Sequence, residues 1–281
     1  MDDTSPVEPA DHGTADPGTA DRAALLADAQ PYCLEHALAL AGPDALRLHG
    51  LAAPVHDTGL LLVTAGGPPL ADLAAGLAET LRAAGHRVRQ APGSARRCQL
   101  AVSVPAAGPG EPSLGSLAGT DTDGAAGQPE LGVELRREPL RHPPTLPAGA
   151  PVPVAALDDT AALAVLTLCE RALPTDLHAL HALTAQRREG ELLALAGAFD
   201  EDFSTRTLAD RLETAAALLP PETDTADTRK WAETWAQDLR LDLLETTELA
   251  DGLYDPYLHD PSPDAHPDRA GADPADPTDD L

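Results

Sequence analysis

The hydrophobic pattern of this chain changes near residue 157, and this change limits what the chain can fold into. Before it, short apolar or alternating runs typical of strands mix with helical patterns, whereas after it apolar residues recur at helical spacing. We expect strands over residues 60–64, 86–90, 97–104 and 131–137. We expect helices over residues 23–41, 70–84, 158–172, 176–186, 191–198, 205–219 and 228–245. The pattern predicts an α/β (α+β) half over residues 22–156 and an all-helical half over residues 157–250.

Three segments have too few apolar residues to contribute to a core. Residues 1–21 hold six acidic residues and no basic one, and residues 251–281 hold nine acidic residues and one arginine. Residues 105–130 are rich in Gly, Pro, Ser, Thr and Asp. Such compositions favour disorder, so we expect two acidic disordered tails and one loop insertion.

The charge of the whole chain disfavours several classes of partner. The sequence has 46 acidic and 19 basic residues, for a net charge of -27. A chain this acidic repels nucleic-acid backbones and anionic membranes, so we expect neither as a partner. No apolar run is long enough to span a membrane, and we expect a cytoplasmic protein. The three cysteines form no CxxC pair, which argues against a zinc ribbon and a disulfide framework.

Two separated segments together carry a recognisable order of motifs. The first is AGPDALRLHGL at residues 41–51, followed by the strand pattern LLLVT at 60–64. The second runs from LDDTAALAVLTLCER at 157–171 to TDLHAL at 175–180. This series resembles the AbiEii/AbiGii-type nucleotidyltransferases, the type IV toxin family of the polymerase-β-like nucleotidyltransferase superfamily. The absence of Asn and Ile and the single Lys indicate a GC-rich genome, as in a divergent actinobacterial member.

The resemblance implies a small mixed sheet, a helical C-terminal domain, and a site at which Mg²⁺ and a nucleoside triphosphate bind if the protein is active. The family's glycine turn and His-Gly segment correspond to Gly42 and His49. Its strand Asp-x-Asp corresponds to Gly59 and Leu61, and Glu134 is a possible remnant of the third carboxylate. Nucleotidyl transfer uses two divalent ions held by such carboxylates, and neither glycine nor leucine offers the side-chain oxygen that a hard cation needs.

The second motif region departs from the family as well. The family's aspartate-rich helix start, arginine and later aspartate correspond to Asp159, Arg171 and Asp176, whereas its lysine falls at Ala164. Another arginine of the family is Thr175 here, and Pro43 removes an N–H from the glycine turn. The resemblance therefore implies a nucleotide-binding remnant at Gly42, His49, Asp159, Arg171 and Asp176. It assigns no catalytic residue and leaves Glu134 as the candidate metal ligand.

Four of these residues also have a purely structural interpretation. His49 fits a packed or turn-capping histidine, and Asp159 and Asp176 fit helix caps. Arg171 fits a charge that stabilises a helix C-terminus. His178 and His181 have a spacing that can chelate a metal, although surface histidines on helices are common.

Three functions remain open at this level. The first is a catalytically degenerate nucleotidyltransferase that acts as a binding or regulatory module for a protein partner. The second is an active metal-dependent nucleotidyltransferase toxin of a type IV toxin–antitoxin system, with Asp57, Glu134 or Asp159 as substitute metal ligands. The third is an acidic adaptor or nucleic-acid mimic that depends on charge alone.

Overall fold

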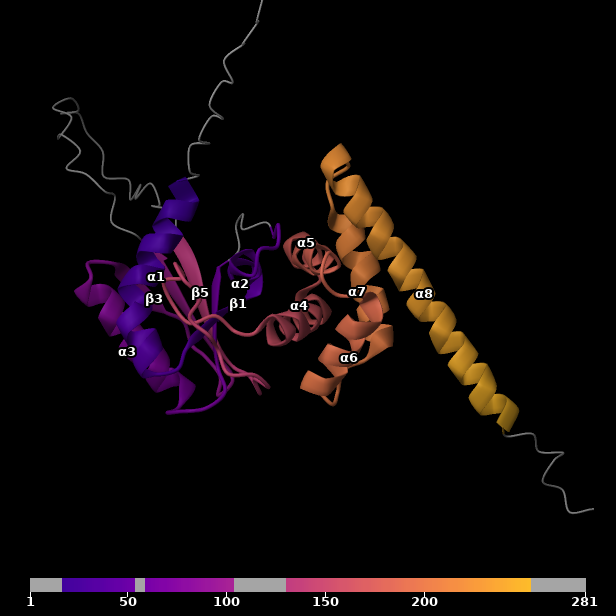
Figure 1. The fold of residues 1–281 in the computed structure, drawn as a ribbon, viewed down its shortest axis with the longest axis horizontal. Coiled ribbons are helices and arrows are strands. Elements are labelled where there is room, and N and C mark those ends of the chain that lie inside the picture. The colour runs from indigo at the N-terminus through magenta and orange to yellow at the C-terminus, as the bar shows by residue number, and fades with distance from the viewer. Residues whose placement is uncertain (1–16, 54–58, 104–129, 254–281) are drawn as a thin grey trace, which may run out of the picture. The chain divides into compact units, whose positions relative to one another are not determined.

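The computed structural model describes residues 17–53, 59–103 and 130–253 (Figure 1). The chain divides into two compact units, residues 1–239 and 240–281. The first unit contains the sheet, helices α1 to α7 and the start of α8 (Thr223–Leu253), and the described part of the second unit is the end of α8. The expected tails and the insertion at 105–130 lie mostly outside the described residues. Residues 17–21 belong to the first helix instead.

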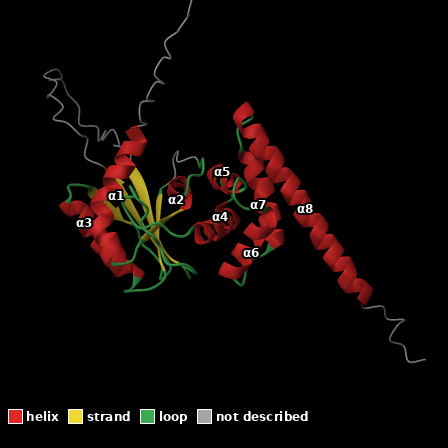
Figure 2. Ribbon diagram, in the orientation of Figure 1, coloured by secondary structure: helices red, strands yellow, loops and turns green. Residues whose placement is uncertain are grey.

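The described residues form a five-stranded mixed sheet in the order β1-β2-β5-β4-β3. Its strands are β1 (Ala39–Ala41), β2 (Leu60–Thr64), β3 (Arg87–Gln90), β4 (Arg97–Ser103) and β5 (Glu130–Arg137). The β2–β5 pair is parallel and the other pairs are antiparallel. The predicted mixed sheet, followed by a helical C-terminal part, is confirmed (Figure 2).

Helices α1 (Pro17–Glu35) and α3 (Leu70–Ala83) cover one face of this sheet (Figure 1). Leu73, Leu77 and Leu81 recur at helical spacing on α3 and are buried against alternate residues of the strands. Because successive strand residues point to opposite faces, the intervening residues of β2, β4 and β5 face the helical part. This second face of the sheet carries the site described below.

The expected helix over residues 23–41 is wrong at both ends. Helix α1 starts earlier, contains Pro31, and ends at Glu35. Ala37 takes a left-handed conformation with φ of 51°, and the Leu38 N–H donates to the Cys33 carbonyl. This closes the helix and frees residues 39–41 to pair with β2 as an edge strand that sequence analysis missed.

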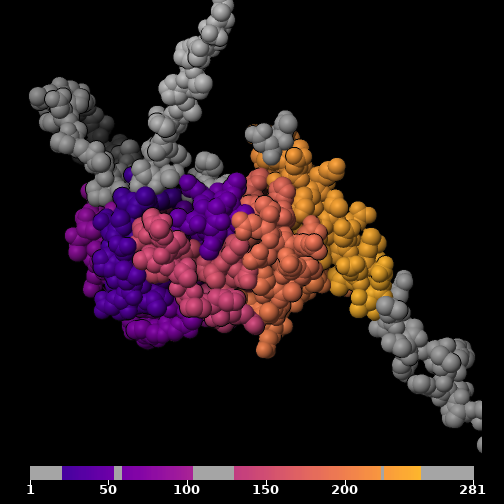
Figure 3. Space-filling view, viewed as in Figure 1, coloured from indigo at the N-terminus to yellow at the C-terminus, as the bar shows by residue number. Residues whose placement is uncertain are grey.

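The helical part packs around a second core formed mainly by leucine and alanine. It comprises α4 (Leu157–Arg171), α5 (Pro174–Leu183), α6 (Glu189–Phe199), α7 (Thr205–Leu218) and the start of α8. Helix α2 (Gly42–Leu48), also missed from the sequence, contacts α4 and α5. The side chains of α4 to α7 adjoin those of the α/β part in Figure 3.

The expected starts of α4 and α5 need correction. Asp159 and Asp176 lie inside the first turns of these helices, whose N-caps are Ala156 and Leu173. Neither helix has a side-chain cap at that position. Among the described residues, no helix is both long enough and apolar enough to cross a membrane.

Candidate functional site

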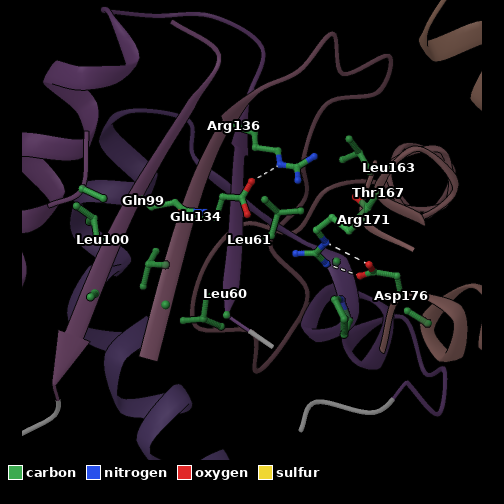
Figure 4. A pocket seen from close by; sticks show the side chains of 18 of the residues that line it. Leu60, Leu61, Gln99, Leu100, Glu134, Arg136, Leu163, Thr167, Arg171 and Asp176 are labelled. Atoms are coloured by element: carbon green, nitrogen blue, oxygen red, sulfur yellow. Dashed lines mark hydrogen bonds and ion pairs between the residues drawn. The ribbon is translucent and has the colours of Figure 1, made fainter. Parts of the chain in front are cut away.

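A cavity of 410 Å³ lies between the second face of the sheet and helices α2, α4 and α5 (Figure 4). Most of the residues to which the family resemblance assigns a role line this cavity. They come from five helices and strands and from Gly59, which directly precedes β2. These are Gly42, Gly59, Leu61, Glu134, Ala164, Arg171 and Asp176. These seven residues, which come from separate parts of the sequence, therefore lie around one cavity.

Strand register builds the floor of this cavity. Leu61 of β2 pairs with Glu134 of β5, and Glu134 pairs with Gln99 of β4. Paired residues on neighbouring strands present their side chains on the same face, so these three side chains lie in a row. A carboxylate at position 61 would stand beside Glu134, but the leucine there contributes only apolar surface.

The Glu134 carboxylate is already engaged by two guanidinium groups. Arg97 Nε donates to Glu134 Oε1 at 2.5 Å, and Arg136 Nε donates to the same oxygen. Burial alone raises the pKa of Glu134, but the hydrogen bonds and charges of Arg97 and Arg136 outweigh it and hold that pKa below its usual range. Glu134 is therefore an anion whose charge is compensated within the protein.

The same arginines connect the sheet to the helical part. Arg136 has a side chain only 5% exposed, and its Nη2 lies 3.0 Å from Glu170 Oε2 on α4. Arg97 Nη2 lies 3.9 Å from the same Glu170 oxygen. The four charges form one network, and in it Glu134 serves as a structural anion between β4, β5 and α4.

Gly59 lies where the backbones of two strands approach closely. A Cβ added at Gly59 would lie 2.6 Å from the carbonyl oxygen of Gly132, closer than real Cβ atoms approach such a group. Position 59 therefore has no room for an aspartate unless β2 and β5 move apart.

The turn at Gly42 lines the cavity but lacks one donor for an anion. Gly42 has a φ of 68°, and a Cβ built on it would be in ordinary contact with the Leu61 Cβ at 3.6 Å. The next residue, Pro43, has no N–H to donate to a phosphate. Asp44, in the first turn of α2, pairs with Arg22 at 3.0 Å. Burial raises the pKa of Asp44 despite the charges of Arg22 and Arg47.

Arg171 and Asp176 form a two-point ion pair at the other wall of the cavity (Figure 4). Arg171 Nε donates to Asp176 Oδ2 at 3.1 Å, and Arg171 Nη2 donates to Asp176 Oδ1. The pair spans the connection from α4 to α5, at which Ala172 is left-handed and Pro174 begins the next helix. Asp176 therefore orients Arg171, and each residue satisfies the other.

Two expected site residues lie away from the cavity. His49 Nε2 lies 2.8 Å from the Ala155 carbonyl oxygen, which ties the end of α2 to the strand-like segment before α4. The Asp159 carboxylate accepts the backbone N–H groups of Arg141 and His142 at 3.2 and 3.0 Å. Both contacts organise local structure.

Sequence reasoning missed the cations and amides of the sheet face. Arg89 and Gln99 line the cavity together with Arg136, and Arg97 donates to Glu134. Alternation along residues 97–103 and 130–137 was the available signal, since it places Arg97, Gln99, Glu134 and Arg136 on one face.

Each arginine among the lining residues is hydrogen-bonded to a carboxylate. Arg89 pairs with Glu130 at 2.5 Å, Arg136 pairs with Glu134, and Arg171 pairs with Asp176. A bound triphosphate would have to displace these carboxylates or add its negative charge beside them. The lining therefore offers a triphosphate little uncompensated positive charge.

The residues present also do not fit a magnesium ion. Glu134 is the sheet-face carboxylate beside Leu61, and both of its arginine partners compete with a cation. Within residues 17–53, 59–103 and 130–253, no group of three or more His, Cys, Asp or Glu side chains is arranged to hold a metal. The substitute ligand Asp57 lies outside these residues, and Asp159 does not line the cavity.

No family profile matches this chain, and no curated protein matches it in sequence. The protein JHP933 from Helicobacter pylori is 13% identical, with a TM-score of 0.48 over 85% of this chain and 99% of that one. A putative nucleotidyltransferase from H. pylori is 14% identical, with a TM-score of 0.46 over 82% and 98% of the two chains. MenT4, a nucleotidyltransferase toxin from Mycobacterium tuberculosis H37Rv, is 17% identical, with a TM-score of 0.46 over 78% and 84%.

Proposed function

We propose that this chain is a nucleotidyltransferase-like protein of the AbiEii type whose cavity no longer transfers nucleotides. It acts in the cytoplasm as a non-catalytic module that binds another protein. The motif order in the sequence supports the ancestry, and the cavity residues support the loss of chemistry.

The pairing of the cavity arginines carries this proposal. Transfer of a nucleotide requires cations that compensate the phosphates and carboxylates that hold the metal. Here Arg136 and Arg171 are satisfied by Glu134 and Asp176, so both charges of each pair are used inside the protein. At the strand positions of the metal carboxylates, Gly59 packs against backbone and Leu61 is apolar.

Calorimetric titration of the full chain with ATP, GTP, CTP and UTP in the presence of Mg²⁺ tests the proposal. We expect no saturable heat at millimolar nucleotide. A saturable heat that disappears in Glu134→Gln would show that the carboxylate binds the metal and would overturn the proposal.

A transfer assay provides the second test. Labelled nucleotide is incubated with the protein, Mg²⁺ or Mn²⁺ and total RNA or protein from a cell extract. Incorporation above that of a sample without the protein would restore the alternative of an active toxin. No incorporation above this background is the expected result.

A further inference from the structure

A second cavity, of 330 Å³, lies where the ends of β4 and β5 meet α4 and the connection from α6 to α7. It shares Arg136 and Leu163 with the first cavity, but its other walls are different. None of the residues discussed as remnants of the ancestral site, Gly42, Gly59, Leu61, Glu134, Ala164, Arg171 and Asp176, lines it. It is therefore a separate candidate for binding.

Aromatic and aliphatic side chains form one side of this cavity. Phe199 at the end of α6 and Phe203 just before α7 both line it, together with Leu166 and Cys169 of α4. The chain contains two phenylalanines, and both are here. Burial raises the pKa of the Cys169 thiol to about 11, so this cysteine is a neutral apolar contact at physiological pH.

Carboxylates predominate among the groups that remain available. Arg97 and Arg136 are engaged by Glu134 and Glu170, as described above. Among the other charged residues that line the cavity, Arg96 is positive, whereas Glu138, Asp200 and Asp202 are negative. The uncommitted charge around the aromatic wall is therefore negative.

Glu138 is the most informative of these carboxylates. It is half-buried, and its side chain accepts no hydrogen bond from the described part of the chain. Burial raises its pKa, Arg136 and Arg96 oppose that change, and Glu170 and Asp200 add to it. A cation that enters beside Glu138 would supply the partner that this carboxylate lacks.

We propose that this second cavity receives an arginine side chain of a protein partner. The guanidinium group packs on Phe199 and Phe203 and donates to Glu138, with Asp200 and Asp202 at the rim. Arginine suits this site better than lysine because its planar group stacks on aromatic rings while its N–H groups reach a carboxylate. The net charge of -27 attracts a basic partner at long range.

This inference rests on the protein-binding part of the proposed function and is independent of whether the first cavity transfers nucleotides. Its test involves no nucleotide, so the two can fail separately. Incorporation of 4-fluorophenylalanine places one ¹⁹F label at each of positions 199 and 203 and nowhere else in the chain. Substitution Phe203→Leu assigns the two signals.

The probe is N-acetyl-arginine N-methylamide, titrated into the labelled full chain at constant ionic strength. We expect saturable shifts of both ¹⁹F signals with a dissociation constant of roughly millimolar size, as suits one side chain without its surrounding interface. The lysine analogue is expected to bind more weakly, and the uncharged norleucine analogue to cause no saturable shift. Equal shifts with norleucine, or none with arginine, would overturn the proposal.

Two variants separate the cavity from general charge attraction. Glu138→Gln keeps the shape and removes the charge, and we expect roughly fivefold weaker binding or a greater loss. Glu79→Gln on α3 makes the same change of charge away from the cavity and is expected to leave binding unchanged. Equal weakening in both would refute a specific site. If the ¹⁹F spectrum without the probe shows that Glu138→Gln misfolds, Asp202→Asn at the exposed rim replaces it in the same titration. Weaker binding than in Glu79→Gln is then the expected result, and equal binding would refute a specific site.

Discussion

Gly59 and Gly132 lie backbone to backbone, with the Gly132 carbonyl oxygen in the space that a Cβ at position 59 would need. The two residues adjoin the first pairs of the parallel β2–β5 ladder, where Leu60 pairs with Val133. The family resemblance assigns a metal carboxylate to position 59. In this protein the close packing of the strands excludes any side chain there, so substitution of one residue does not restore that ligand.

Gly59→Ala is expected to lower the free energy of unfolding by about 1–3 kcal/mol, the usual cost of forcing atoms into packed space. Gly66→Ala is the matched control, since a Cβ there meets nothing within 4 Å. That control should be neutral or slightly stabilising because alanine restricts the unfolded chain. Chemical denaturation of both variants measures the difference. Equal stabilities would mean that the strands separate at little cost.

The helices and strands with a strong hydrophobic periodicity could be predicted from the sequence, whereas the short strand β1 at the edge of the sheet could not. Residues 60–64 and 70–84 carry clear strand and helix patterns, and β2 and α3 lie there almost residue for residue. Strand β1 is three residues long. It follows a turn in which Ala37 is left-handed, and the sequence has no glycine there to signal the end of the helix. Short elements of this kind are fixed by tertiary pairing.

The convergence of Glu134 and Asp176 on one cavity was implied by the resemblance, but the partners of these carboxylates were not. Arg136 is two residues from Glu134 on the same strand, whereas Arg97 lies on β4 and reaches Glu134 only through the β4–β5 register. Register depends on the whole sheet, so it is difficult to predict from a single sequence which charged side chains pair across strands.

Glu134→Gln is expected to destabilise the protein by about 1–3 kcal/mol, because the buried Arg136 would lose one of its two charged acceptors and keep only Glu170. Glu130→Gln is the control: Glu130 pairs with Arg89 at the surface, where the side chains are 41% and 74% exposed. A surface pair of this kind contributes at most about 1 kcal/mol. Urea denaturation compares the two. A loss for Glu130→Gln as large as that for Glu134→Gln would contradict a structural role of the buried network.

Asp176→Asn is expected to strengthen the binding of pyrophosphate to the first cavity, since it releases the Arg171 guanidinium from its charged partner. The affinity for pyrophosphate should rise about three- to tenfold, because the interaction energy of one partly exposed ion pair corresponds to a change of that size. Asp158→Asn serves as control because it releases Arg187 from a similar ion pair, and neither Asp158 nor Arg187 lines the cavity. Calorimetry with pyrophosphate measures both. The same gain in both variants would indicate a general effect of charge.

The histidines of α5 predict how the stability of the helical part depends on pH. Burial lowers the pKa of His178, and the charge of His181 lowers it further. Burial also lowers the pKa of His181, against a smaller opposing effect of Asp227. His181 stacks on Trp231 with ring centroids 4.7 Å apart, and its Nδ1 lies 2.9 Å from Thr228 Oγ1. The neutral rings are therefore favoured in the folded state.

A histidine whose folded pKa lies below its unfolded value of 6.5 stabilises the protein above that value. As pH falls through and below 6.5, the unfolded chain takes up protons that the folded chain resists, and stability is lost. Fluorescence of Trp231 and Trp235, the two tryptophans of the chain, follows unfolding between pH 8 and 5. The double substitution His178→Gln and His181→Gln should flatten this dependence. If the double variant retains the full loss of stability, other groups carry the pH dependence.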